Sequence, residues 1–184
     1  IEFLGAILLA LRFVPRFGTI KGIYFSLFHA VSAFCNGGFD LMGTDEAYSS
    51  LVAFEGDVLV NLVIVTLIIV GGIGFIVWDD VARNKWHFRR YLLHSKIVIT
   101  VTFLLTVLGT ILFLITEKDA AFAGMNPLER FLGALFSSVT PRTAGFNSVD
   151  TAALSNSGKL LTMVMMFIGG SPGSTAGGVK TTSM

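Results

Sequence analysis

The sequence has few charged residues and a single cysteine. Lys, Arg, Asp and Glu make up 14% of its 184 residues, whereas an ordinary soluble domain is about 25% charged. The one cysteine, Cys35, excludes an internal disulfide, and three scattered histidines form no recognisable metal site. No basic stripe with interleaved aromatic residues is present, so the sequence does not predict binding to nucleic acid.

Apolar residues are abundant instead. The chain is 53% hydrophobic, and its mean hydropathy is +0.77. These residues cluster in long runs rather than in amphipathic stripes, which predicts an integral membrane protein in a lipid bilayer. Residues 58–78 and 97–116 are each long enough to span the bilayer. Because the sequence opens with Ile1 inside an apolar segment, we interpret it as a fragment of a longer multi-pass protein of the cell membrane.

Two further apolar segments are too short to cross a membrane. A helix over residues 23–34 rises about 18 Å, whereas the hydrocarbon core is about 30 Å thick. Residues 35–39 follow it and contain two glycines. Pro127, a favourable first-turn residue, begins a second short helix that is expected to end near Val139 and to lead into a turn at residues 140–147. A short helix that dips into the membrane and returns through a glycine turn is typical of a pore loop.

The two halves of the chain form an internal repeat. Each half contains a first helix, a short helix, a glycine turn and a second helix, in the same order. The connections differ in length, so the offset between aligned positions varies. The aligned stretches are residues 4–8 with 108–112, 27–28 with 135–136, 38–40 with 145–147, and 70–72 with 168–170.

The chemistry of ion binding explains why such turns contain glycine. A cation inside a membrane must exchange its water shell for protein oxygens, and backbone carbonyls supply them when the chain is held extended toward an axis. Glycine is needed where φ leaves the usual region. A short helix that ends before the turn directs its negative end at the ion. Residues 36–39 and 143–146 fit this description, although two ordinary glycine turns after buried helices are the alternative.

A glycine-rich stretch follows the short apolar run 158–168, and it has three interpretations. A flexible linker is disfavoured, because the stretch lies inside what should be a span. A phosphate loop needs one residue fewer between its last glycine and Lys180, and it also needs a preceding strand. A broken transmembrane helix is tolerated where its backbone lines a cavity, and this interpretation is favoured. The stretch comprises Gly169, Gly170, Ser171, Pro172, Gly173, Ser174, Thr175, Ala176, Gly177 and Gly178.

Three stretches resemble a known family: SAFCNGGFD, TPRTAGFN and FIGGSPGSTAGGVKTT. They are similar to the Ktr/Trk/HKT superfamily of potassium transporters, and most similar to the bacterial Ktr-type membrane subunit. The resemblance covers essentially the whole chain. It implies an all-α integral membrane fold in which four helix–pore-loop–helix repeats surround one pore, and this chain would hold most of the second and third repeats.

The resemblance also implies the functional residues and partners. The filter would come from Cys35, Asn36, Gly37, Gly38, Phe39, Arg142, Thr143, Ala144, Gly145 and Phe146, and residues 169–178 would form an intramembrane gate below it. Potassium would be held by filter backbone alone, with no cofactor and no enzymatic step. The expected partners are a second copy of the chain and a cytosolic nucleotide-binding regulatory ring.

The predicted organisation is a repeat at 1–78, a basic linker at 79–96 and a repeat at 97–184. The linker holds five Lys or Arg residues, whereas residues 40–57, which include Asp45 and Glu46, hold none. The positive-inside rule therefore places the linker in the cytoplasm. Trp78 and Trp86 are expected to be interfacial anchors.

Two other functions are disfavoured by the sequence. A secondary transporter with broken helices, for another cation such as Na⁺, predicts inverted repeats, but these repeats run parallel. A membrane enzyme needs an acid–base or metal cluster within the spans, and neither 58–78 nor 97–116 contains one. His29 is expected to be a packed side chain, and Cys35 a small buried one.

Overall fold

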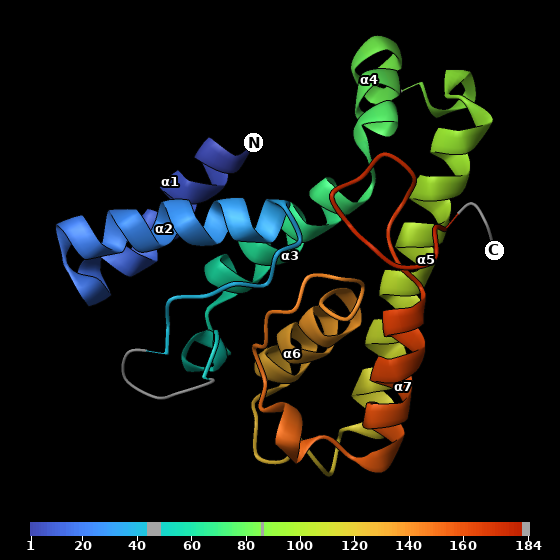
Figure 1. Ribbon diagram of the computed structural model, residues 1–184. Helices are drawn as coiled ribbons and strands as arrows, with labels where there is room; N and C mark the ends of the chain where they lie inside the picture. Colours follow the sequence, from blue (N-terminus) through green and yellow to red (C-terminus); the bar gives the residue numbers. More distant parts are fainter. Residues whose placement is uncertain (44–48, 86, 182–184) are drawn as a thin grey trace.

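The computed structural model describes residues 1–43, 49–85 and 87–181, so the predicted roles of Asp45, Glu46 and Trp86 lie outside the described residues. Within these ranges the regular structure is helical apart from one isolated bridge, which confirms the all-α class (Figure 1). The helices are α1 Glu2–Phe17, α2 Thr19–Phe34, α3 Val58–Gly72, α4 Phe75–Asn84, α5 Leu93–Thr116, α6 Pro127–Val139 and α7 Asn156–Phe167, with 3₁₀ turns at Val52–Phe54, Phe88–Arg90 and Thr151–Ala153.

Two units of the same order make up the fold. The first contains α1, α2 and α3, and the second contains α5, α6 and α7. In each unit a 3₁₀ turn precedes the last helix, and a side chain caps that helix at its N-terminus. Asp57 accepts from the Val60 N–H at 3.1 Å in α3, and Ser155 accepts from the Gly158 N–H at 3.0 Å in α7. This equivalence extends the aligned repeat through the loops.

The lengths of the helices decide which of them cross a membrane. By length and composition, α5 with its 24 residues is the one helix in the described ranges that spans alone, and α3 with α4 passes as a bent pair. The short helices α2 and α6 have 16 and 13 residues, so they rise only about 24 and 20 Å. They enter the bundle without crossing it.

The first two helices differ from the prediction. The short helix expected from residue 23 begins at Thr19 as α2, and α1 before it continues through Pro15 to Phe17. Pro15 lies in the last turn, where its missing N–H removes only one helical hydrogen bond. Gly18 separates the helices because its φ of 83° is outside the helical region.

The predicted unbroken span at residues 58–78 is wrong. Helix α3 ends at Gly72, and α4 begins at Phe75 after a bend of 97°. The glycine-rich stretch supplies partners for the freed backbone: Ser171 N–H donates to the Gly72 carbonyl, and Phe75 N–H donates to the Gly173 carbonyl, each at 3.0 Å. A helix can break at membrane depth only where such groups are satisfied.

Trp78 stabilises this bend rather than acting only as an interfacial anchor. Its indole N–H donates to the Val70 carbonyl at 2.9 Å. Its ring also meets Phe34 edge to face, with centroids 5.5 Å apart. The side chain therefore joins the last turn of α3 to the end of α2.

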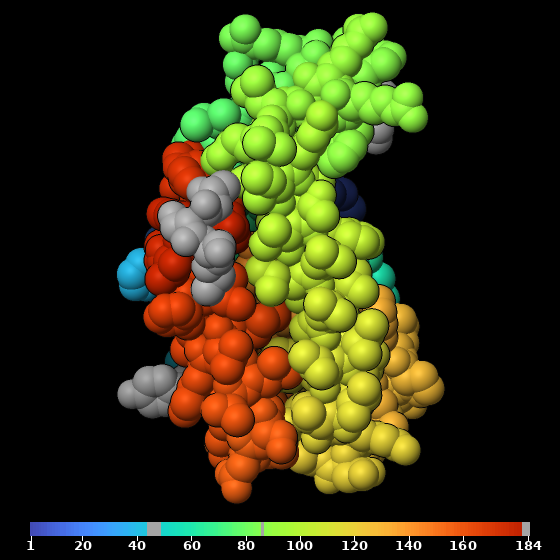
Figure 2. Space-filling view, turned by 90° about the vertical axis from the view of Figure 1, so that its right-hand side faces the viewer, coloured from blue at the N-terminus to red at the C-terminus, as the bar shows by residue number. Residues whose placement is uncertain are grey.

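The two units share one hydrophobic core. Phe13 and Ile64 of the first unit belong to the same buried cluster as Phe136 and Phe146 of the second. The outer faces of α5 and α7, which lie side by side in Figure 2, are also apolar. Such faces need lipid or further protein to cover them. The exposed residues include Phe103, Leu108, Ile111, Ile115, Leu160, Met163 and Phe167.

Candidate functional site

The two glycine turns meet each other in the structure. An ideal Cβ on Gly38 would lie 2.3 Å from the Ala144 carbonyl oxygen, and one on Gly145 would lie 3.4 Å from the Gly38 Cα. The first distance is far too short for a real Cβ, so residue 38 must be glycine for the turns to touch. The segments 35–39 and 142–146, which were predicted as filter segments, thus lie against each other at Gly38 and Gly145.

Both turns have the same backbone pattern. Asn36 and Gly38 have φ values of 51° and 68°, and Thr143 and Gly145 have values of 79° and 87°. A left-handed residue therefore precedes each glycine by two positions. Threonine is disfavoured in this region because it is β-branched. Since both units adopt the pattern, surrounding contacts must impose it.

The hydrogen bonds that close the turns are also equivalent. Ser32 in α2 donates its hydroxyl to the Phe39 carbonyl at 2.8 Å, and Thr140 after α6 donates to the Phe146 carbonyl at 2.5 Å. Each bond ties the short helix to the residue after the glycine. The C-terminal ends of α2 and α6, which carry partial negative charge, thus point at the paired turns.

The side chains around the turns differ between the two units. Phe146 is fully buried and contacts His29 of α2, with centroids 6.2 Å apart, whereas Phe39 is 72% exposed. Cys35 is exposed, so the prediction that it is buried is wrong. His29 is fully buried, and its Nδ1 lies 2.7 Å from the Phe25 carbonyl, as expected of a packed side chain.

Arg142 was predicted as a filter residue through its backbone, and the structure adds a buried guanidinium for which the sequence predicted no role. Its side chain lies behind the second turn and donates from Nη2 to the Thr102 hydroxyl of α5 at 3.4 Å. Its Nε–H and the Asn36 side-chain oxygen have no hydrogen-bond partner among the described residues. Both groups line one small cavity that also touches Gly170. Arg142 therefore lies between the two turns and the glycine-rich stretch.

The stretch at 169–178 packs beneath the first turn. The Thr175 hydroxyl donates to the Phe34 carbonyl and accepts from the Asn36 side-chain amide, each at 2.9 Å. The N–H groups of Gly169 and Gly170 donate to carbonyls further along the chain, Gly170 to Gly177 at 3.1 Å. The N–H groups of Ser174 and Thr175 are also engaged, with the carbonyls of Ser171 and Gly71 at 3.3 and 3.4 Å, so the segment before Gly178 does not form an open cradle for phosphate.

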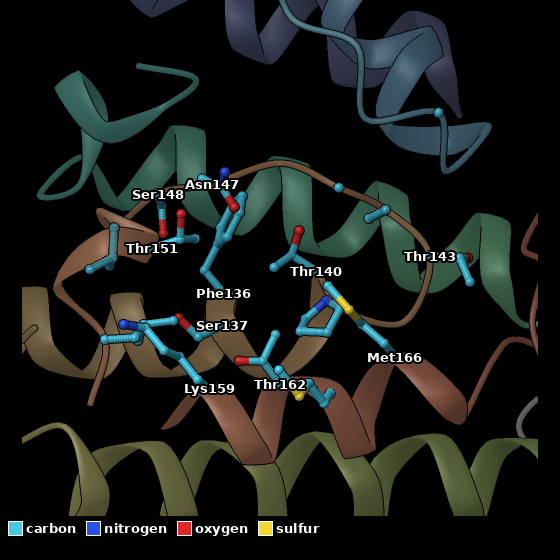
Figure 3. A pocket seen from close by; sticks show the side chains of 17 residues that line it. Phe136, Ser137, Thr140, Thr143, Asn147, Ser148, Thr151, Lys159, Thr162 and Met166 are labelled. Carbon is cyan, nitrogen blue, oxygen red and sulfur yellow. The ribbon is translucent and has the colours of Figure 1, made fainter. Parts of the chain in front are cut away.

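A pocket of about 770 Å³ opens between α6, the second turn and α7 (Figure 3). Ser137, Thr162 and Met166 line it. At the offsets of the repeat, these positions correspond to His29, Ile64 and Ile68 in the first unit, where α6 and Phe146 are packed. In the first unit, α6 and Phe146 cover the equivalent surface. In the second unit, the same surface lines the pocket.

A buried carboxylate positions α7, and sequence reasoning missed it. Glu117 at the end of α5 is fully buried and accepts from the Ser155 N–H at 2.9 Å and from its hydroxyl at 2.5 Å. The carboxylate thus lies at the positive end of the α7 dipole. In sequence, Glu117 resembles any polar residue at the end of a span, and no local pattern relates it to Ser155.

Together these features define a class of membrane protein with re-entrant pore loops. Two helices too short to cross a membrane lead into glycine turns that meet inside an apolar bundle, and a non-helical segment packs against the first of these turns. Within the described ranges no three His, Cys, Asp or Glu side chains gather as a metal cluster. The model of the TrkH family, described as cation transport protein, matches residues 6–184, and the chain belongs to this family. Its members are membrane transport proteins of the cell membrane rather than enzymes.

Similar proteins extend well beyond this chain. The potassium/sodium uptake protein NtpJ of Enterococcus hirae is 48% identical and the Ktr system potassium uptake protein B of Bacillus subtilis is 39% identical; each alignment covers all of this chain and 40% of the relative. The crystal structure of the potassium transporter TrkH from Vibrio parahaemolyticus has a TM-score of 0.70 at 21% identity, over 98% of this chain and 36% of that one. The chain thus spans about two fifths of these relatives, and the solved structure confirms its fold.

Proposed function

We propose that this chain is part of the pore-forming subunit of a potassium uptake system, in which K⁺ passes the backbone carbonyls of the two glycine turns. The observation that carries the proposal is the contact between Gly38 and Gly145 in two turns of equal backbone pattern. One glycine turn after a buried helix is common. Two equivalent turns that meet at the ends of half-crossing helices support an ion path.

The arrangement fits passive movement of a cation. Backbone carbonyls replace water around the ion, and the C-terminal ends of α2 and α6 make the site electronegative. The hydroxyls of Ser32 and Thr140 fix the carbonyl after each glycine, so they hold the turn in one conformation. No covalent chemistry is required of any side chain.

The stretch at 169–178 is the proposed gate. It lies against the end of α2 and the break between α3 and α4. Small residues let such a segment move with little steric hindrance, and its hydroxyls and backbone can face water when it moves. A partner that pulls on the segment can then change the flux.

The family relationship further supports a homodimer and a cytosolic nucleotide-binding ring as partners. The relative from Bacillus subtilis is named as component B of a Ktr system, which agrees with a transporter of several subunits. The basic linker at 79–96 is the proposed cytoplasmic side. An inverted-repeat transporter for another cation is disfavoured because the two glycine turns are parallel neighbours. The name of NtpJ includes sodium, so both ions must be measured.

The test is potassium uptake by the full-length protein with a serine at each filter glycine. Gly38→Ser and Gly145→Ser should abolish growth rescue of an uptake-deficient strain at low potassium or let sodium compete. Gly124→Ser is the matched control, because Gly124 has a φ of 83° and nothing within 4 Å of an added Cβ. It has similar backbone strain but lies away from the turns. Wild-type rescue by both filter variants would refute the proposal.

A further inference from the structure

We propose that Asn36 and Thr175 form a latch that couples the filter turn of the first unit to the glycine-rich stretch, so that a change in one alters the other. The inference rests on the proposed function, and it deepens that function by naming the contact through which gate and filter communicate. The two residues lie far apart in sequence, because their numbers differ by 139.

The latch consists of two hydrogen bonds through one hydroxyl. Thr175 donates to the carbonyl of Phe34, the last residue of α2, and it accepts from the Asn36 amide in the turn itself. Asn36 is only 9% exposed. A buried amide that loses its acceptor is costly, because water does not readily replace the lost partner. Displacement of Thr175 therefore destabilises the Asn36 conformation that begins the turn.

Backbone geometry makes Asn36 sensitive to this contact. Its φ of 51° lies in the left-handed region, which asparagine tolerates better than most residues because its side chain bonds locally. The Asn36 amide also lies 3.5 Å from the Phe34 carbonyl. The Thr175 hydroxyl thus completes a small network that holds a left-handed residue directly before the filter glycines.

The other attachments of the stretch to the first unit run through backbone groups. Ser171 and Thr175 donate their N–H groups to the carbonyls of Gly72 and Gly71, at 3.0 and 3.4 Å. These bonds hold the stretch against the broken helix, not against the turn. Among the described residues, the hydrogen bonds from the stretch to α2 and its turn all pass through Thr175. Coupling between gate and filter is therefore concentrated there.

Linkage makes the coupling reciprocal: a filter conformation that favours the latch favours the closed gate, and an open gate loosens the filter. Loss of one hydrogen bond of about 1 kcal/mol corresponds to about a fivefold change in the equilibrium. Because Thr175→Val breaks both bonds of the latch, we expect it to raise unregulated potassium flux by more than about fivefold and also to weaken discrimination against sodium. A gate residue uncoupled from the filter would change flux alone.

The experiment is a double-mutant cycle in the full-length protein, reconstituted in liposomes and assayed for potassium and sodium flux. Thr175→Val removes the hydroxyl at constant shape, and Asn36→Gly removes the amide while keeping a residue that accepts positive φ. Thr175→Ser retains the hydroxyl and should behave as wild type. Thr66→Val is the matched control, because Thr66 is exposed on α3, away from the turn and the stretch.

The latch predicts that Asn36→Gly, which breaks one of the two bonds, raises flux and lowers selectivity less than Thr175→Val, which breaks both. The double variant should behave as Thr175→Val alone, because that variant has already lost the bond that the two residues share. Additive effects, a Thr175→Ser variant as impaired as Thr175→Val, or raised flux at unchanged selectivity would each overturn the latch. A wild-type protein that carries no potassium would instead refute the proposed function. If Thr175→Val does not assemble, Asn36→Gly and Thr175→Ser still decide between these outcomes.

Discussion

Replacing Gly158 with alanine tests how α7 is held. In an ordinary helix this change is stabilising by about 1 kcal/mol, because glycine is the more flexible residue. Here an ideal Cβ would lie 2.0 Å from Glu117 Oε1 and 2.7 Å from its carboxyl carbon. The carboxylate must therefore move, and its bonds to the Ser155 N–H and hydroxyl are lost.

The expected magnitude follows from burial. Glu117 is fully buried, so a displaced carboxylate has no ready contact with water. A buried group that loses its partner costs about 1–3 kcal/mol, and more when it is charged. After subtraction of the gain in helix propensity, we expect Gly158→Ala to lower the free energy of unfolding by about 2 kcal/mol. Helix propensity alone would raise it.

The assay is thermal unfolding of the purified full-length protein in detergent. Gly72→Ala is the matched control, because the nearest atom to its added Cβ is 3.9 Å away. The Glu117→Ala background supplies a second control: without the carboxylate, Gly158→Ala should be neutral or stabilising. Unchanged or increased stability of Gly158→Ala in the wild-type background would show that Glu117 does not hold the α7 N-terminus.

The remaining predictions concern topology and the gate. On a Cys35→Ser background that still transports, a cysteine at Lys85 should react with an impermeant thiol reagent only from the cytoplasmic side, and one at Asp119 only from outside; external labelling at position 85 would reverse the orientation. Deletion within residues 171–177 should leave an assembled protein with raised flux that responds less to the regulatory ring. Normal flux from a well-folded deletion variant would place the gate elsewhere.

Local signals predicted some elements to the residue. Helix α6 begins at Pro127 and ends at Val139, as expected. The proline favours the first helical position, and the Glu129 carboxylate accepts from the Asn126 N–H at 2.8 Å, which satisfies a free donor at the helix start. The proline and the Asn126–Glu129 pair lie within four residues of each other. The start of this helix is therefore determined by local sequence.

The break between α3 and α4 could not be predicted in this way. Residues 58–78 form a mostly apolar run without a charged residue, and glycines within such runs are common in membrane helices. The cause of the break lies about 100 residues later in the chain, where the stretch at 169–178 supplies the partners for Gly72 and Phe75. A pattern confined to one helix contains no information about those partners.

The same distinction applies to the candidate site. Gly38 and Gly145 were predictable because a positive φ selects glycine locally. The different exposures of Phe39 and Phe146 depend instead on which neighbour each turn packs against. The contact between Asn36 and Thr175 joins segments that no local pattern relates. The sequence thus indicated where the chain turns, and the tertiary contacts determine what each turn touches.

The broken helix and the stretch at 169–178 stabilise each other, and this limits how the stretch can move as the proposed gate. The carbonyls of Gly71 and Gly72 and the N–H of Phe75 are bonded to the stretch at 169–178. If the stretch leaves, these three groups lose their partners at membrane depth, which is unfavourable in a dry environment. Movement of the proposed gate therefore requires water to reach the break, so we expect its opening to coincide with hydration of the segment below the proposed filter.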